Sequence, residues 1–424
     1  MQLTPLYLGL DFGTSGARAV VIDDQGRTLA QVHCSYDIAD WRSWLNALHG
    51  LCASLPPPLR RRIASIAIDG TSSSVLLCNN ENVPIAPPVL YNDACAAQQV
   101  PKIAAHAPAG HTTTSATSSL AKLLHLLHQH PHATEGYFSD QASWLAAMMT
   151  GKPGLSDYHN ALKLGYDVEE LHWPAWIVKL GVKAWLPTVL APGTLLGQLT
   201  PEVAATLDLP AACRVRAGTT DSIAAFIASG ADTPGTGVTS LGSTLVLKLL
   251  STQRLEDARY GVYSHRFGDL WLAGGASNSG GAVLRQFFDE ATLARLSLQI
   301  NPDQASSLDY YPLVTPGERF PINDPQRASR LTPRPASDTL FLHGLLEGIA
   351  RIEARGYALL ANLGATPLTK VLTVGGGAKN TTWTHMRQRL LGVTVQTANQ
   401  DAAAYGAAWL AKSGSNLLCL HNDE

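Results

Sequence analysis

The chain has 424 residues, 46% of them hydrophobic and 15% charged, and its formal net charge is −2. This length favours two domains, and the composition is typical of a well-buried globular α/β protein. Because no basic run and no interleaved basic and aromatic stretch occurs, nucleic acid is not an expected partner. No window of about 18 uninterrupted apolar residues appears, so we also expect no membrane span.

The N-terminus lacks the basic and then apolar layout of a signal peptide. The six cysteines are scattered without Cys-x-x-Cys spacing, which predicts neither a zinc cluster nor a disulfide framework. Single cysteines suit a reducing compartment. The sequence therefore predicts a cytoplasmic protein without a membrane partner.

The first motif in the chain is an apolar strand, a glycine turn and a second β-prone run. Gly13 and Gly16 allow backbone conformations that other residues avoid, so the N–H groups of the turn can point at an anion. Thr14 and Ser15 add hydroxyl groups, and Asp11 lies at the end of the first strand, where it can hold a metal ion or its waters. A carboxylate beside a phosphate cradle implies a divalent cation between them. The alternative is an ordinary β-hairpin.

Hydrophobic periodicity and helix or strand breakers define the next elements. We expect a third strand over residues 28–36, a helix over 41–55 and a buried strand over 63–69. The buried strand ends in a small polar loop that contains Ser72, and open α/β sheets place ligand groups at such strand ends. A further strand is expected over residues 75–79.

Asn92 and Asp93 follow an apolar, proline-rich stretch and precede helical residues. Either residue can cap that helix. Alternatively, either residue can contact a ligand in the same cleft as Ser72. Longer helices are predicted over residues 116–130 and 140–150.

Histidines cluster where the first of these longer helices ends. His125 and His128 can share one face of the helix, which leaves a metal site open. Pro131 breaks that geometry, and no acidic residue or cysteine supports a metal site there. A solvated helix end is therefore the favoured interpretation.

In the middle of the chain, a glycine turn places Asp221 at the start of an apolar helix that closes at Gly230. Asp221 is a suitable N-cap for this helix. The stretch 237–248 then repeats the strand, glycine turn and strand of the N-terminus. Two such hairpins at matching points of similar-sized halves indicate a duplicated fold, with a cleft between domains at residues 1–230 and 231–424.

A long polar stretch and a long helix follow the second hairpin. Residues 301–338 are rich in Pro, Asp and Ser, which predicts an exposed loop or lid. Residues 339–363 form an amphipathic helix, with Glu347, Arg351 and Glu353 on its polar side.

Near the C-terminus, a strand runs into three consecutive glycines, Gly375–Gly377, and then into a helix. Bare backbone at this turn lets a flat ring approach closely, and Asn380 and Trp383 are placed to hydrogen-bond to the ring or to stack on it. A tight strand-to-helix turn is the alternative. The last helix, over residues 401–412, is rich in alanine and glycine, which suits close packing.

Taken in order, these motifs resemble the FGGY family of carbohydrate kinases, which has the fold of actin, sugar kinases and heat-shock ATPases. The resemblance covers nearly the whole chain and runs through Asp11–Arg18, Asp69–Ser74, Tyr91–Asp93, Gly218–Asp221, Leu241–Thr244, Asn278–Gly281 and Gly375–Trp383. It implies an α/β fold of two duplicated ribonuclease H-like domains with a ligand cleft between them. The N-terminal domain would bind sugar, phosphate and Mg²⁺, and the C-terminal domain would bind ATP.

The resemblance implies an enzyme that uses ATP and Mg²⁺ to phosphorylate the terminal hydroxyl of a small-molecule sugar, a ketopentose. Asp221 would act as the base that activates the hydroxyl, and Asp11 would hold Mg²⁺. Ser72, Asn92, Asp93 and Asp221 would face the sugar. The phosphates would lie among Thr14, Ser15, Gly242, Ser243 and Thr244, and adenosine would lie against Gly376, Gly377, Asn380 and Trp383.

Residues 69–73 read Asp-Gly-Thr-Ser-Ser, where xylulose kinases of the family carry a Met-His-Gly-type contact. This departure favours D-ribulose over D-xylulose as the substrate. Three alternatives stay open: another FGGY kinase that acts on xylulose, glycerol or a different polyol, an actin- or chaperone-like ATPase, and a nonenzymatic sugar-binding protein. We expect a monomer or a homodimer.

Overall fold

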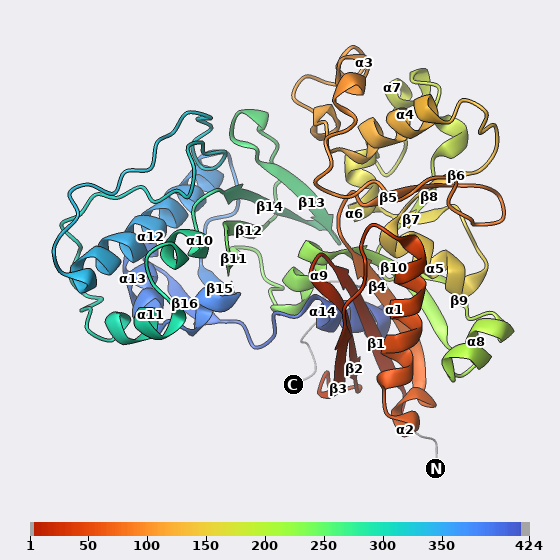
Figure 1. Cartoon of the computed structure of the whole chain (residues 1–424), viewed down its shortest axis with the longest axis horizontal. Coiled ribbons are helices and arrows are strands. Elements are labelled where there is room, and N and C mark those ends of the chain that lie inside the picture. The colour runs from red at the N-terminus through yellow and green to blue at the C-terminus, as the bar shows by residue number, and fades with distance from the viewer. Residues whose placement is uncertain (1–3, 417–424) are drawn as a thin grey trace. The chain divides into compact units, whose positions relative to one another are not determined.

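The computed structural model describes residues 4–416, which form two compact units (Figure 1). The first unit joins the chain up to Ala228 to the segment from Ala402 onward, and the second unit is Ser229–Asp401. The division at Ala228 lies close to residue 230, where the sequence predicts it. The C-terminal helix α14 (Ala403–Ser413) belongs to the first unit, however, and not to the expected domain 231–424.

Small residues explain why α14 joins the first unit. A Cβ atom on Gly9 would lie 1.9 Å from the Ala404 carbonyl oxygen, and a Cβ atom on Gly406 would lie 1.9 Å from the Ala224 carbonyl oxygen. The backbone of α14 therefore rests directly on two elements of the first unit, β1 (Leu6–Gly13) and α9 (Asp221–Ala228). The close packing predicted for the last helix is confirmed.

A six-stranded mixed sheet forms the centre of the first unit, in the order β3-β2-β1-β4-β10-β9. β1 runs parallel to β4, and β4 runs parallel to β10, whereas the other neighbours are antiparallel. The predicted N-terminal hairpin and the buried strand after the first helix are confirmed. The remaining strands are β2 (Gly16–Ile22), β3 (Thr28–Cys34), β4 (Ile63–Gly70), β9 (Leu195–Gln198) and β10 (Arg214–Thr220).

The second unit repeats this topology. Its sheet has the order β13-β14-β12-β11-β15-β16, with an antiparallel β11–β12 hairpin and with β15 and β16 running parallel to β11. Strand for strand, β14-β12-β11-β15-β16 matches β3-β2-β1-β4-β10 in order and direction, so the predicted duplication is confirmed. The strands are β11 (Thr236–Leu241), β12 (Leu245–Ser251), β13 (Tyr263–Phe267), β14 (Leu270–Ser277), β15 (Lys370–Val374) and β16 (Thr394–Thr397).

Helices pack against each sheet, and an insertion between β4 and β10 has a hydrophobic core of its own. Outside the insertion, the first unit contains α1 (Trp41–Ser54), α2 (Pro57–Arg60), α5 (Gln141–Thr150), which packs on β4 and β10, α8 (Pro201–Leu207), α9 and α14. The insertion contains β5 (Val75–Cys78), β6 (Tyr137–Asp140), β7 (Leu155–Asp157), β8 (Thr188–Leu190), α3 (Val100–Ala104), α4 (Ser119–Gln129), α6 (Tyr158–Ala161) and α7 (Ala175–Lys179). The second unit contains α10 (Gly281–Arg285), α11 (Glu290–Ser297), α12 (Asp338–Asn362) and α13 (Thr381–Leu391).

The polar side predicted for the long helix α12 is wrong for two of its three residues. Glu347 and Glu353 are both buried. Glu353 forms a buried ion pair with Arg387 of α13, with an Oε2–Nε distance of 2.6 Å. Glu347 accepts hydrogen bonds from Arg351 and Arg389, both at 2.8 Å. Arginine partners allow these carboxylates to be buried, and two of them, Arg387 and Arg389, lie on α13, where the periodicity of α12 does not reveal them.

The stretch 301–338 contains no helix or long strand, as predicted, but it is not exposed throughout. Tyr310, Tyr311 and Phe320 are buried in the core of the second unit. Glu318 is buried as well, and it accepts hydrogen bonds from the hydroxyl groups of Ser277 at 2.6 Å and Tyr311 at 2.9 Å. Much of this stretch is therefore anchored to the sheet.

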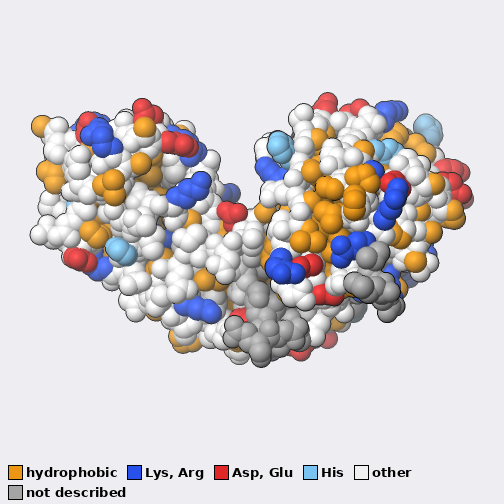
Figure 2. Space-filling model, turned by 90° about the horizontal axis from the view of Figure 1, so that it is seen from below, with side chains coloured by type: hydrophobic (Ala, Val, Ile, Leu, Met, Phe, Trp, Pro, Cys, Tyr) orange, Lys and Arg blue, Asp and Glu red, His pale blue; other side chains and the backbone are white. Residues whose placement is uncertain are grey.

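The distribution of charged side chains on the surface and the hydropathy of the helices bear on whether the protein has a charged or membrane partner. On the face shown in Figure 2, basic and acidic side chains are interspersed over both units. Within residues 4–416, no helix is long and apolar enough to cross a membrane.

Candidate functional site

Three carboxylates gather where the parallel strands of the first sheet end. Asp11 of β1 and Asp69 of β4 are register partners, and Asp69 is paired in turn with Thr219 of β10. Asp221 is the first residue of α9 and directly follows the last residue of β10. Burial and the nearby charges of Asp11 and Asp221 raise the pKa of Asp69 well above its ordinary value. The electrostatic coupling indicates that the three carboxylates share one site.

One arginine contacts this cluster directly. Arg18 forms an ion pair with Asp11, with an Nη1–Oδ2 distance of 3.1 Å. Both side-chain oxygens of Asp69 are buried, and no N–H or hydroxyl group of residues 4–416 donates to them. The neighbouring Asp11 carboxyl is close enough to share a proton with Asp69, a contact that acts to lower the pKa of Asp11 and to raise that of Asp69. Burial raises the pKa of Asp11 as well, although its hydrogen bond to Arg18 opposes the shift. Buried carboxylates without a full set of donors suit a cation or a proton-transfer role.

The donor set fits Mg²⁺ better than a metal held by protein ligands alone. Within residues 4–416, no group of three or more His, Cys, Asp or Glu side chains is arranged to hold a metal ion. Magnesium in nucleotide sites commonly uses one or two carboxylates and completes its shell with water and phosphate oxygens. Asp11 and the neighbouring Asp69 can supply those two carboxylates. The histidines around His125 lie outside this cluster and form no such group.

The first glycine turn lies beside the carboxylates. Thr14 and Ser15 are exposed at the tip of the β1–β2 hairpin, and Gly16 has a φ of +142°, which favours glycine. Ser15 Oγ accepts a hydrogen bond from Arg18 Nη2 at 3.3 Å. The turn therefore combines exposed hydroxyl groups with one cation, Arg18.

Tyr36 and Gln141 connect this turn to the loop after β4. The Tyr36 hydroxyl donates to the Gly13 carbonyl at 2.8 Å, and Gln141 Nε2 donates to the Tyr36 hydroxyl oxygen at 3.3 Å. Gln141 Oε1 in turn accepts hydrogen bonds from Thr71 N and Thr71 Oγ1, both at 3.2 Å. No local sequence signal marks this network, because its members are far apart in the chain.

The residues expected to face a sugar lie on two neighbouring loops. Ser72 is half-buried in the loop after β4, and Asn92 and Asp93 are exposed in the loop after residue 90. Tyr91 N donates to Ser74 Oγ at 3.1 Å, so the two loops are joined. Asp93 Oδ1 accepts from Cys95 N at 2.8 Å, so Asp93 caps a turn and does not cap a long helix.

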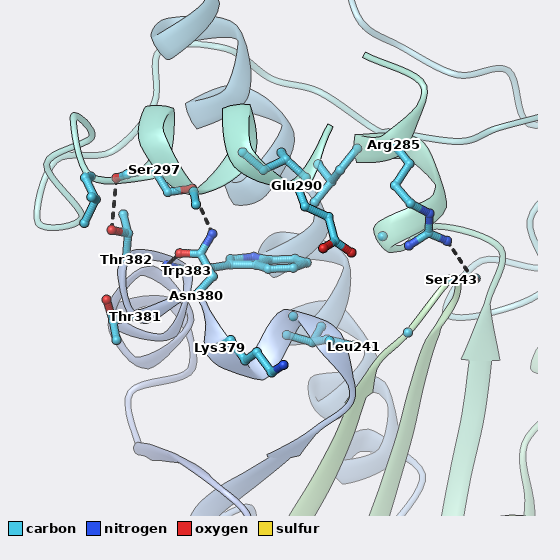
Figure 3. Close-up of a pocket in the computed structure, with 18 residues that line it drawn as sticks. Leu241, Ser243, Arg285, Glu290, Ser297, Lys379, Asn380, Thr381, Thr382 and Trp383 are labelled. Carbon is cyan, nitrogen blue, oxygen red and sulfur yellow. Dashed lines mark hydrogen bonds between the residues drawn. The ribbon is translucent and has the colours of Figure 1, made fainter. Parts of the chain in front are cut away.

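A cavity of about 500 Å³ opens in the second unit (Figure 3). Its walls are the β11–β12 turn, α10, α11 and the glycine turn that leads into α13. Gly242 and Ser243 line the cavity from the second hairpin, and Gly376 and Gly377 line it from the glycine turn. Thr244 belongs to the same hairpin turn but is not among the lining residues. Most residues expected to contact ATP in this half of the chain therefore converge on one cavity.

Asn380 and Trp383 line the cavity, but both also have structural roles. Asn380 Oδ1 accepts from Trp383 N at 3.0 Å and caps α13, and Asn380 Nδ2 donates to Ser297 Oγ at 2.8 Å. Trp383 is 2% exposed, and its indole N–H donates to the Leu346 carbonyl at 2.9 Å. The tryptophan ring is therefore part of the buried floor and offers little free surface for stacking.

Charged side chains that no sequence motif marks also line the cavity. Arg285 Nη2 donates to Ser243 Oγ at 2.8 Å, which places a guanidinium group at the second glycine turn. Glu290 of α11 and Lys379 lie on opposite sides of the cavity in Figure 3. An exposed cation beside a glycine turn is suited to bind a phosphate group.

Comparison with known proteins matches both halves of the chain. The model of the FGGY family of carbohydrate kinases, N-terminal domain, matches residues 6–228, and the corresponding C-terminal domain model matches residues 237–414. The xylulose kinase of Staphylococcus xylosus is 23% identical over 98% of this chain and 92% of its own length. The xylulose kinase of Bacillus subtilis is 24% identical over 96% of this chain and 88% of its own length.

Solved structures show the same fold. A xylulose kinase from Rhodospirillum rubrum has a TM-score of 0.84 and 21% identity, covering 98% of this chain and 92% of that one. A gluconate kinase from Lactobacillus acidophilus also has a TM-score of 0.84, with 17% identity over 99% of this chain and 91% of that one. With two matching domain models in the expected order, the chain belongs to the FGGY family of carbohydrate kinases and is an ATP-dependent sugar kinase.

Proposed function

We propose that this enzyme transfers the terminal phosphoryl group of ATP to the terminal hydroxyl of a ketopentose. The observation that supports the proposal best is the carboxylate cluster at the ends of β1, β4 and β10, which combines Asp11, a fully buried Asp69 and Asp221. Such a cluster provides both a position for a cation and a base beside it.

Asp221 is the proposed base. A sugar hydroxyl is a poor nucleophile, and a carboxylate within hydrogen-bond reach assists it by accepting its proton as the new P–O bond forms. Asp221 begins α9 directly after β10, so its backbone is held between a strand and a helix. This placement restricts the carboxylate, and positioning supplies much of the rate enhancement in phosphoryl transfer.

Asp11 and Asp69 are the residues that would hold Mg²⁺. When bound, Mg²⁺ neutralises charge on the phosphate oxygens. Thr14 and Ser15 of the first turn and Gly242, Ser243 and Thr244 of the second turn would contact those phosphates. Arg285 adds a guanidinium group at the second turn, and the cavity of the second unit would receive adenosine against Gly376, Gly377 and the floor formed by Trp383.

D-ribulose is the first candidate substrate, and D-xylulose is the second. The Asp-Gly-Thr-Ser-Ser sequence at residues 69–73 favours ribulose, whereas the xylulose kinases among the relatives favour xylulose. Incubation of the enzyme and Mg-ATP with each ketopentose, followed by ³¹P NMR and mass spectrometry of the product, tests this choice. We expect a pentulose 5-phosphate; ATP hydrolysis without a phosphorylated sugar would contradict the proposal.

We also propose that the enzyme works in the cytoplasm as a monomer or a homodimer. The described cysteines, Cys34, Cys52, Cys78, Cys95 and Cys213, carry free thiols, the state that a reducing compartment maintains. Light scattering at micromolar concentration measures the oligomeric state, and a larger assembly would contradict this part of the proposal.

A further inference from the structure

Lys122 of α4 is fully buried, and among the described residues it is the only buried lysine. Its ammonium group donates hydrogen bonds to two backbone carbonyls, Ser73 O at 2.8 Å and Leu90 O at 2.5 Å. These carbonyls belong to the two loops that contain Ser72, Asn92 and Asp93. One side chain therefore joins the loops that hold the expected sugar contacts.

Ser73 shows how firmly the first loop is held. Its φ is +68°, a left-handed conformation that costs free energy for a residue with a side chain. Besides the Lys122 contact to its carbonyl, its hydroxyl oxygen accepts a hydrogen bond from Ser119 Oγ at 3.1 Å. Ser119 and Lys122 lie three residues apart on α4, so the same face of one helix fixes both groups of Ser73.

The second loop is joined to the first at several points. Tyr91 N donates to Ser74 Oγ. Ser74 Oγ forms a further hydrogen bond with Thr71 Oγ1, at 2.5 Å. Asp93 N donates to the same Leu90 carbonyl that accepts from Lys122. Removal of the ammonium group would therefore take one donor from a carbonyl in each loop. The Leu90 carbonyl would keep the Asp93 amide, and the remaining contacts would hold the loops near each other.

Burying a lysine is costly, which argues that its ammonium group has a specific task. Desolvation lowers the pKa of Lys122 to about 8, and the charge of Lys163 adds to this shift. Asp93 and Cys95 act in the opposite direction, so the carboxylate of a candidate sugar contact helps to keep the lysine charged. The lysine is thus coupled electrostatically to the loop that it holds.

We propose that Lys122 is a positioning residue for the sugar, which holds the Ser72 loop and the Asn92–Asp93 loop in the arrangement that binds the substrate. This inference rests on the proposed function, because it takes these loops as the sugar site. Preorganised loops bind without losing further conformational freedom, so loosening them weakens sugar binding. The nucleotide cavity is built from other elements, and its affinity for ATP should not change.

The test compares Lys122→Met with wild type and with Lys152→Met. Methionine keeps most of the aliphatic length but removes the donors. Lys152 is a matched control, since its Nζ also donates to a backbone carbonyl, Leu196 O at 2.9 Å, away from both loops. We expect Lys122→Met to raise the KM for the sugar about tenfold or more while the KM for ATP changes less than about twofold. Lys152→Met should change neither constant by more than about twofold.

A second readout does not depend on catalysis. Hydrogen exchange of the amides of Ser74, Tyr91 and Asp93, all hydrogen-bonded in this structure, should speed up about tenfold or more in Lys122→Met and stay unchanged in Lys152→Met. If Lys122→Met does not fold, Ser119→Ala provides a milder loss of support for Ser73, with the same expected direction in sugar KM and exchange.

The outcomes separate this inference from the proposed function. The positioning role would be overturned if the wild type is active and Lys122→Met changes neither the KM for the sugar nor the hydrogen exchange. Ser119→Ala takes the place of Lys122→Met in this comparison if Lys122→Met does not fold. A wild type that phosphorylates no ketopentose would overturn the proposed function, and sugar positioning with it. Faster exchange in the variant would then show only that Lys122 supports the loops. Equal increases in the KM for sugar and for ATP would assign Lys122 a general structural role and contradict the proposal.

Discussion

Asp11 and Asp69 are register partners on the parallel strands β1 and β4, and Asp69 is fully buried without a hydrogen bond from any N–H or hydroxyl group of residues 4–416. Two carboxylates on adjacent strands would repel each other when both are ionised, and Arg18 offsets only part of that charge. The arrangement favours a cation at the strand ends and leaves Asp221, on the neighbouring helix, for proton transfer.

Asp221→Asn should lower kcat by at least about 10²-fold, because asparagine cannot accept the proton of the sugar hydroxyl. Nucleotide affinity, measured by calorimetry, should stay within about twofold of wild type. Asp208→Asn is the control, since Asp208 is an exposed C-cap of the same unit. Near-normal turnover of Asp221→Asn would remove this residue from the role of base.

Arg285→Gln should raise the KM for ATP about 10- to 100-fold, because a charge-assisted hydrogen bond to a phosphate contributes about 1.5–3 kcal/mol. The KM for the sugar should not change. Arg259→Gln serves as the control, because Arg259 is an exposed residue of the same unit whose carboxylate partner is Asp257. An unchanged KM for ATP in Arg285→Gln would show that the guanidinium group does not contact the phosphates.

The buried Lys122 predicts a pH-dependent difference in stability. Its pKa is lowered to about 8 in the folded chain, whereas an unfolded lysine titrates near 10.5. Between these values the unfolded chain binds more protons, so the free energy of unfolding of wild type should rise with pH relative to Lys122→Met. Urea denaturation of both proteins at pH 7.5 and pH 9.5 measures the difference. A wild-type advantage that shrinks as the pH rises would contradict the lowered pKa.

Gly9→Ala should lower the free energy of unfolding by about 2 kcal/mol or more, since its Cβ atom would lie 1.9 Å from the Ala404 carbonyl oxygen and force α14 away from β1. Gly50→Ala is the matched control within α1, where a Cβ atom meets nothing within 4 Å. It should raise the free energy of unfolding by about 0.5–1 kcal/mol through helix propensity. Equal stability of the two variants would mean that α14 is not packed directly on β1.

Local sequence patterns predict the individual strands, turns and helices of this fold well. Strand alternation and glycine turns identify both hairpins, and Asp11 and Asp221 stand out because each lies at a strand or helix boundary. The repeated hairpin also predicts the duplication, because strand order within each sheet follows from the same hairpin and crossover.

Long-range contacts account for what the sequence alone did not predict. The alanine-rich helix α14 was expected to pack closely, but its sequence does not say against which unit. Helical periodicity places the charged Glu353 on the polar face of α12. The structure buries it because Arg387 of another helix pairs with it, and periodicity does not reveal that partner. Tyr36, Gln141 and Lys122 act through hydrogen bonds to residues far away in the chain. Trp383 is buried in the core of the second unit, and its indole N–H donates to the Leu346 carbonyl of α12, so its burial could not be inferred from its position after the glycine turn.

Ketopentose kinase activity is tested most directly by ADP release from the wild-type enzyme with Mg-ATP alone and with D-ribulose, D-xylulose, gluconate or glycerol. We predict rapid ADP release with a ketopentose, fastest with D-ribulose, and slow release without sugar. Equal ADP release with and without sugar, or ketopentose rates no higher than those with glycerol and gluconate, would contradict a ketopentose kinase.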